Sequence, residues 1–159
     1  MGGYKVDTHI QTIFQKLVGL EKVQHGLAFI EADQERTIME QKEIVVIEAP
    51  TFAEKARAED YRKRLERLGL QDVHIDGHGN VLGKLPGKGQ GPTVLLEAHL
   101  DTVFPFGTDV TPVEKDGKIY APGICDDTRG LAANLSVIRA FLETGIETEG
   151  DIIFAGTVA

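Results

Sequence analysis

The chain has 159 residues, of which 42% are hydrophobic and 26% charged, as is usual for a globular protein. Its 17 Lys and Arg against 25 Asp and Glu give a formal net charge of -8, which disfavours nucleic acids and anionic membrane surfaces as partners. No segment approaches the roughly 18 apolar residues of a membrane helix, and the first residues lack the apolar core of a signal peptide. A single cysteine, Cys125, forms no internal disulfide, so we predict a cytoplasmic location.

The first part of the chain is predicted to be helical. Residues from about 8 to 47 contain no proline and repeat apolar side chains at helical spacing. We expect Gly19 and Gly26 to interrupt this pattern. We therefore divide the chain into a helical N-terminal segment at 1–42, without an assigned role, and a portion at 43–159 that carries the chemistry.

A further helix is predicted after Pro50. Thr51 and Glu54 fit a capping box, with Thr51 as the N-cap and the Glu54 side chain reaching back. The helix should run to about Leu68, and Gly69 should end it. Its many charged residues are expected to form only a solvated face.

Strand patterns dominate the remainder, and their order with the helices predicts an α/β fold with a mixed sheet flanked by helices. The continuous apolar run at 93–98 is typical of a buried central strand. A site is expected where this strand and the strand at 151–157 deliver their carboxyl ends. The predicted elements are strands at 73–75, 81–85 and 93–98, a hairpin at 113–120, a helix from about 131 to 142 and a strand at 151–157.

Three polar residues follow these elements in a pattern that suits metal chemistry. His99 comes directly after the apolar strand, and Asp101 lies two residues later on the same side of an extended chain. An imidazole can ligate zinc through one nitrogen while a carboxylate holds the other, which predicts His99 as a ligand and Asp101 as the residue that orients it. Asp126 stands in a Gly-containing loop before a helix, where a carboxylate can bridge two metal ions about 3.5–4 Å apart.

The same residues lie in two longer motifs, HLDTVFP at 99–105 and YAPGICDDTRGLAA at 120–133. In these motifs, and in the order of elements from about Glu43 to Val158, the chain resembles the two-zinc metallopeptidases and deacylases. That family includes glutamate carboxypeptidase, acetylornithine deacetylase, succinyl-diaminopimelate desuccinylase, aminoacylase and peptidase T. The resemblance implies a zinc-peptidase-like catalytic domain, of which this chain is the N-terminal part. Thr128 departs from the family's frequent Lys, at a position that is not a ligand.

The resemblance also implies roles for the matching residues. His99 would bind one zinc, Asp101 would orient His99, and Asp126 would bridge both zincs through a cis peptide to Asp127. Cobalt or manganese are alternatives to zinc. The family's Glu-Glu pair, a general base and a ligand, would follow the strand at 151–157, where the chain ends. The later ligands and the lid and dimerisation domain would be absent too, so we expect a truncated domain that is inactive by itself.

Plainer interpretations compete for several residues. Asp127 is expected to act as a helix cap, which leaves Asp126 as the ligand. Cys125 is interpreted as a packed neighbour of Asp126 and not as a thiolate ligand. His74 and His78 are expected to be surface turn residues, the alternative being a third metal site.

The sequence therefore predicts a metal-dependent hydrolase of amide bonds, either a peptidase or an N-acyl amino acid deacylase. Its substrate would be a small peptide or an N-acylated amino acid, and the resemblance implies that the intact protein can form a homodimer. The alternative is a non-catalytic interaction module, or a decayed gene product, that reuses the fold. In that case the strand at 151–157 would be an open sheet edge that recruits a partner. A Glu-Glu pair encoded directly beyond Ala159 would favour the enzyme.

Overall fold

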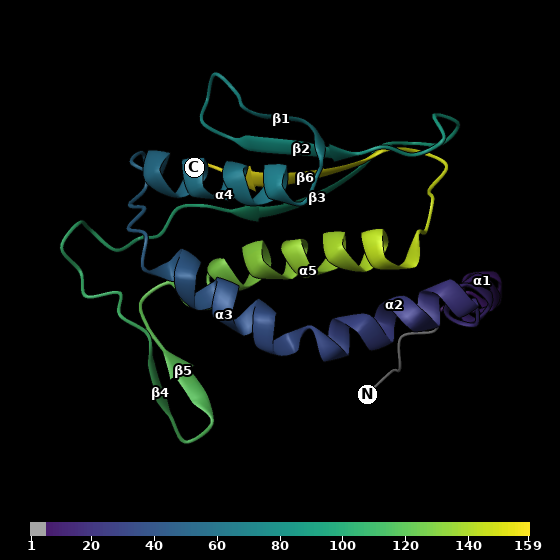
Figure 1. Ribbon diagram of the computed structural model, residues 1–159, viewed down its shortest axis with the longest axis horizontal. Coiled ribbons are helices and arrows are strands. Elements are labelled where there is room, and N and C mark those ends of the chain that lie inside the picture. The colour runs from purple at the N-terminus through teal and green to yellow at the C-terminus, as the bar shows by residue number, and fades with distance from the viewer. Residues whose placement is uncertain (1–5) are drawn as a thin grey trace.

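The computed structural model describes residues 6–159 (Figure 1). Helices and strands form a mixed α/β structure, which confirms the predicted fold class. Within the described residues, each helix is too short or too polar to span a lipid bilayer. The elements are α1 (Thr8–Val18), α2 (Glu21–Ala32), α3 (Gln34–Val45), α4 (Lys55–Arg67), β1 (Gln71–Ile75), β2 (Val81–Leu85), β3 (Val94–His99), β4 (Val113–Lys115), β5 (Lys118–Tyr120), α5 (Thr128–Thr144) and β6 (Ile152–Thr157).

The N-terminal segment is helical from Thr8 onward, with breaks at Gly19 and Asp33, while its residues 1–5 lie outside the described residues. Gly19 caps the end of α1, as predicted. Gly26 does not interrupt a helix, contrary to our expectation, because it lies buried inside α2. A Cβ at that position would lie 3.5 Å from the Thr144 side chain, an ordinary van der Waals contact, so Gly26 lies where α2 packs against α5. The second break falls instead at Asp33, whose carboxylate pairs with Arg139 of α5.

The main sheet has the strand order β1-β2-β6-β3, in which only β3 and β6 are parallel. Our prediction that 93–98 is a buried central strand is wrong, because β3 lies at the edge and Leu95 is 56% exposed. The expectation that 151–157 forms an open edge is wrong as well, because β6 pairs with β2 on one side and β3 on the other. An apolar run signals burial of some side chains but does not encode which strand takes the central place.

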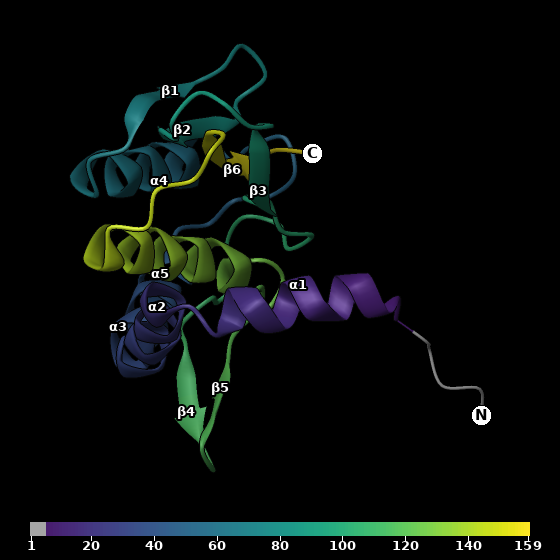
Figure 2. The same cartoon turned by 90° about the vertical axis from the view of Figure 1, so that its right-hand side faces the viewer.

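Helices cover the sheet in two layers (Figures 1 and 2). α4 packs over β1 and β2, and α5 packs over β3 on the same face. The Tyr61 hydroxyl of α4 donates to the Leu131 carbonyl oxygen of α5 at 3.3 Å, which joins the two helices. α2 and α3 form the outer layer against α5. The core is a cluster of buried apolar residues that come mainly from both inner helices and three strands, namely Ile44, Ala58, Tyr61, Leu65, Leu70, Val81, Ala98, Leu100, Leu131, Leu135, Ile138, Ile152 and Phe154.

The start of α4 differs from the predicted capping box. Thr51 is not an N-cap, because α4 begins only at Lys55. The Glu54 carboxylate accepts a hydrogen bond from the Phe52 amide at 2.7 Å and so closes the turn before the helix. Gly69 ends α4 as predicted, with a φ of +80° that suits a residue without Cβ.

Candidate metal centre

β3 and β6 are parallel neighbours, so their carboxyl ends lie side by side at the same end of the sheet, as predicted. His99 pairs in register with Thr157, and the Leu100 amide then donates to the Thr157 carbonyl oxygen at 2.7 Å. The loop that carries Asp126 leads into α5, which begins beside this end at Thr128. The ends of parallel strands and the start of a helix thus enclose the predicted residues, an arrangement that often forms a site in α/β proteins.

The His99 ring lies between two carboxylates. Its Nδ1 is 3.0 Å from the Asp101 carbonyl oxygen and 3.1 Å from Asp101 Oδ1. Its Nε2 is 2.9 Å from Asp126 Oδ1. The structure therefore brings together the three residues that the sequence singled out. Because Asp101 engages Nδ1, Nε2 is the ring nitrogen that faces Asp126.

Negative charge surrounds this imidazole. The side chains of Asp101, His99 and Asp126 are 16%, 37% and 90% exposed. Burial by itself lowers the pKa of His99, but the hydrogen bond with Asp126 and the charges of Asp101 and Asp127 outweigh it and raise that pKa above its ordinary value. A site with three carboxylates around one ring attracts a cation.

Asp127 caps α5, as expected. Its Oδ1 accepts from the Gly130 amide at 3.0 Å, and its Oδ2 accepts from the His99 amide at 3.2 Å, so one carboxylate joins the helix to the strand. A Cβ at residue 130 would lie 2.4 Å from Asp127 Oδ1, so this contact requires glycine there. The peptide bond between Asp126 and Asp127 is cis, as the resemblance implies.

A pocket of about 270 Å³ opens beside His99 and Asp126. Its other walls come from the loop after β3, including Phe104, and from the loop before α5. Cys125 lines this pocket and is exposed, so the expectation of a packed neighbour is wrong. The pocket gives a small molecule direct access to the imidazole and the carboxylate.

A buried arginine that we expected on a solvated face supports the strand end. Arg57 of α4 is 1% exposed, and its Nη1 donates to the Leu100 carbonyl oxygen at 2.7 Å. Burial lowers the pKa of Arg57 to about 10, and the charge of Asp101 opposes this shift. The missed signal was the spacing of Arg57, Tyr61 and Leu65, which places the arginine on the apolar side of the helix.

Thr51 is a second support that the sequence did not reveal. Its hydroxyl donates to Asp101 Oδ2 at 3.2 Å, while Asp101 Oδ1 faces His99. Both carboxylate oxygens of Asp101 are therefore held, which fixes the plane of the group that holds His99. No local signal predicts this contact, because the two residues are 50 positions apart.

The donors at this end of the sheet suit zinc in type. An imidazole nitrogen and a carboxylate oxygen are preferred zinc ligands, and here they converge to 2.9 Å. Among residues 6–159, no group of three or more His, Cys, Asp or Glu side chains is arranged to hold a metal ion. The described residues thus bring two candidate donor atoms together, His99 Nε2 and Asp126 Oδ1. His78 is an exposed turn residue, as predicted. His74 is exposed too, but it lies in β1 and not in the turn, and its Nδ1 is 2.7 Å from the Asp72 carbonyl oxygen.

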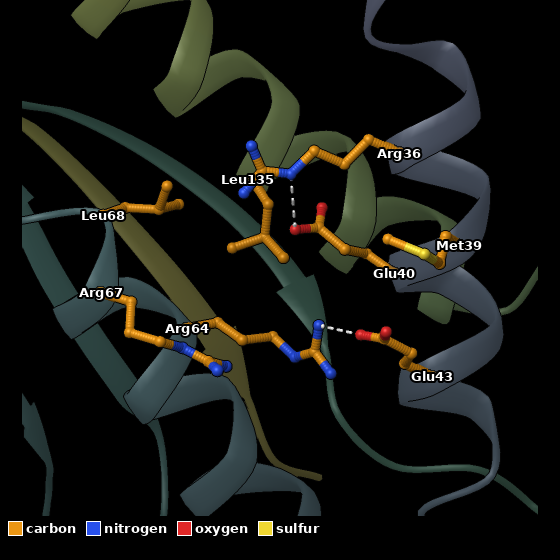
Figure 3. Close-up of a pocket in the computed structure, with 8 residues that line it drawn as sticks. All are labelled: Arg36, Met39, Glu40, Glu43, Arg64, Arg67, Leu68 and Leu135. Carbon is orange, nitrogen blue, oxygen red and sulfur yellow. Dashed lines mark hydrogen bonds and ion pairs between the residues drawn. The ribbon is translucent and has the colours of Figure 1, made fainter.

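A second pocket, of about 230 Å³, lies between α3 and α4 (Figure 3). Leu68 and Leu135 line it together with several charged side chains. These charges pair with one another, since Arg64 contacts Glu43 at 2.9 Å and Arg36 contacts Glu40 at 3.5 Å. Both carboxylates of this pocket therefore face an arginine, in contrast to the carboxylates around His99.

The fold and the paired donors define an α/β protein with a candidate metal centre at the carboxyl ends of parallel strands. Residues 95–159 match the sequence profile of Peptidase family M20/M25/M40. This part of the chain is thus similar to the family, and the chain spans about a third of the length of the curated relatives that it matches.

Individual relatives agree with this similarity. A putative LysW-lysine/LysW-ornithine hydrolase from Pyrococcus abyssi is 34% identical over 117 residues, which cover 74% of this chain and 31% of the relative. A tripeptidase from Staphylococcus aureus is 31% identical with a TM-score of 0.68, over 78% of this chain and 36% of the other. The aminopeptidase PepT from Bacillus cereus is 33% identical with a TM-score of 0.68, over 79% and 36%.

Proposed function

We propose that this chain is the metal-binding part of a hydrolase that cleaves amide bonds in small peptides or N-acylated amino acids. The observation that carries the proposal is the convergence of His99 Nε2 and Asp126 Oδ1, with Asp101 holding the opposite ring nitrogen. The match of residues 95–159 to a peptidase family supports the reaction class. The names of the similar tripeptidase and aminopeptidase support a small peptide as substrate.

In this proposal, His99 and Asp126 are metal ligands and Asp101 is a positioning residue. Asp101 keeps the proton of His99 on Nδ1, so that the Nε2 lone pair points into the pocket. Asp126 presents its exposed carboxylate from the loop before α5, where it can bridge two ions. Zinc is the expected metal, with cobalt or manganese as alternatives. Such ions, when bound, polarise an amide carbonyl and activate water near neutral pH.

We propose further that this chain by itself does not catalyse hydrolysis at ordinary enzyme rates. Catalytic zinc sites normally take three protein ligands each, whereas His99 and Asp126 supply two in all. Proton transfer from the attacking water also needs a general base within hydrogen-bond reach. Asp101 and Asp127 are occupied by His99, Thr51 and the backbone amides of His99 and Gly130, so neither is free for that task.

Metal titration of the 159-residue chain tests the proposal. We expect saturable Co²⁺ binding that broadens the His99 ring signals in NMR spectra and is lost in His99→Ala and Asp126→Ala. His78→Ala, which removes an exposed turn histidine, is the matched control and should bind as the wild type does. Binding that survives both ligand substitutions contradicts the site. Metal-dependent cleavage of dipeptides by the unaltered chain at ordinary rates contradicts the expected inactivity.

A further inference from the structure

The loop that presents Asp126 is held from outside the site by a residue of α3. Gln41 is 7% exposed, and its Nε2 donates to the Ile124 carbonyl oxygen at 2.5 Å. Ile124 lies two residues before Asp126, whereas Gln41 lies 83 positions before Ile124 in the sequence. The contact therefore links the N-terminal helical segment, to which the sequence assigned no role, with the candidate metal centre.

The same carbonyl group is also bound from α5. The buried Thr128 hydroxyl lies 2.8 Å from the Ile124 oxygen and 2.9 Å from the Gly123 oxygen. Gln41 and Thr128 thus hold the loop from two different helices. The Asp126 side chain is 90% exposed, so its position depends on this backbone and not on packing around the carboxylate.

Ion pairs fix α3 in place beside α5. Arg139 of α5 is 5% exposed and contacts Glu40 of α3 at 2.8 Å. It also contacts Asp33, at the start of α3, at 2.6 Å. Glu40 directly precedes Gln41, so the buried pair sets the position of the helix one residue away from the loop contact. The Gln41 amide is consequently presented from a rigid element.

We propose that Gln41 is a positioning residue for the metal centre. Its amide holds the loop at Ile124 so that the Asp126 carboxylate meets the His99 imidazole in a geometry ready for a metal ion. This inference rests on the function proposed above. Gln41 itself does not touch the metal, because its side chain is engaged with the backbone on the buried side of the loop.

Co²⁺ titration of two variants of the full 159-residue chain tests this role. Gln41→Met keeps the length of the side chain but removes the donor, and Gln41→Asn keeps an amide that is too short to reach Ile124. We expect each to weaken Co²⁺ binding by about tenfold, the lower end of the effect seen for residues that orient metal ligands. The absorption spectrum of bound Co²⁺ should change as well, because the ligand geometry is altered.

Thr144→Val is the matched control. It also removes a buried hydrogen-bonding group, but Thr144 donates to Ala140 within the last turn of α5, at the opposite end of the helix from the loop. We expect it to lower the urea midpoint while leaving Co²⁺ affinity and spectrum unchanged. If both Gln41 variants bind Co²⁺ with the affinity and spectrum of the control, the positioning role of Gln41 is overturned. The proposed metal site at His99 and Asp126 is not contradicted by that result.

A separate result would overturn the proposed function itself. In that case the wild-type chain would show no Co²⁺ binding that depends on His99. Amide hydrogen exchange of Cys125 and Asp126, which needs no metal, then still measures how firmly the loop is held. Faster exchange in Gln41→Met than in Thr144→Val supports a Gln41 contact that holds the loop, and equal exchange in the two variants overturns that contact too.

Discussion

Two clusters of charged residues in this molecule are built in opposite ways. The first is the candidate metal centre, where Asp101 and Asp126 flank His99 at the end of β3. The second is the buried ion-pair cluster, in which Arg139 contacts Asp33 and Glu40 between α5 and α3. Asp126 is 90% exposed, whereas the side chains of the buried cluster are at most 11% exposed.

The two clusters differ in how their carboxylates are paired, and this separates a structural cluster from a candidate functional one. In the buried cluster each carboxylate faces the Arg139 guanidinium, and Asp33 also accepts from Ser136 at 2.7 Å. Such complete pairing is what makes buried charge tolerable. Among residues 6–159, the ion-pair partner of Asp126 is His99 alone. The candidate metal centre therefore carries excess negative charge, which the proposed function assigns to a bound cation.

The largest expected effect comes from removing the cation of the buried cluster. Arg139→Met leaves Asp33 and Glu40 buried without their partner. We therefore expect the free energy of unfolding to fall by about 3–5 kcal/mol relative to the wild type. Urea unfolding measures this. Arg62→Met, which removes an arginine paired with Glu59 on the surface of α4, should have a much smaller effect. Equal losses in both variants would contradict the contrast between buried and exposed pairs.

The pH dependence of stability follows from Asp33. Burial raises the pKa of Asp33, but hydrogen bonds from Arg139 and Ser136 and the charge of Arg139 outweigh it and hold that pKa below its usual 3.8. A lowered pKa in the folded state means that the stabilisation is complete above the unfolded value and is lost as the pH falls through the folded value.

We therefore expect the stability difference between wild type and Arg139→Met to narrow as the pH falls below about 4. In the variant, Asp33 is buried without its cation, and its protonation on acidification relieves the cost of burying a charge. Urea unfolding of both proteins between about pH 6 and pH 3 measures the difference. A constant difference over this range would show that Asp33 is not the responsible group.

At the candidate metal centre, Asp101→Asn should change metal binding more than stability. The amide that replaces the carboxylate no longer supports the basicity of His99, so we expect Co²⁺ affinity to fall by about tenfold. Asp109→Asn is the control, because Asp109 is an exposed carboxylate that accepts only a local hydrogen bond from Thr111 at 2.9 Å. Equal Co²⁺ affinities of Asp101→Asn and Asp109→Asn would contradict the positioning role of Asp101.

The smallest expected effect is that of Thr51. Thr51→Val removes the hydroxyl that holds Asp101 Oδ2, and the loss of one hydrogen bond predicts a decrease of about threefold in Co²⁺ affinity. Thr51→Ser keeps the hydroxyl and should bind as the wild type does. A loss of affinity in the serine variant as large as in the valine variant would mean that packing, and not the hydrogen bond, supports Asp101.

Much of the local structure could be read from the sequence. The hairpin around Asp116 and Gly117 forms as predicted, with positive φ at both residues, as a type I′ turn requires. The helix predicted from about 131 to 142 is also confirmed, as α5, which Gly145 caps. These features depend on neighbouring residues only, so a single sequence contains the information.

The sequence failed where a residue's role is set by a distant segment. Thr51 looks like a helix cap in isolation, yet it binds Asp101 across the strand end. Arg57 looks like a solvated charge, yet it is buried against the Leu100 carbonyl oxygen. In both cases the competing partner lies more than 40 positions away and has no local signature.

The sequence by itself determined which residues could do chemistry, namely His99, Asp101 and Asp126. It also placed them at the end of a strand and the start of a helix, because spacing, turn residues and apolar periodicity are local properties. Only the tertiary structure decided that β6 and not β3 is central and that Gln41 supports the Asp126 loop. The order of strands and the burial of polar side chains follow from contacts between segments far apart in the chain, which local patterns do not contain.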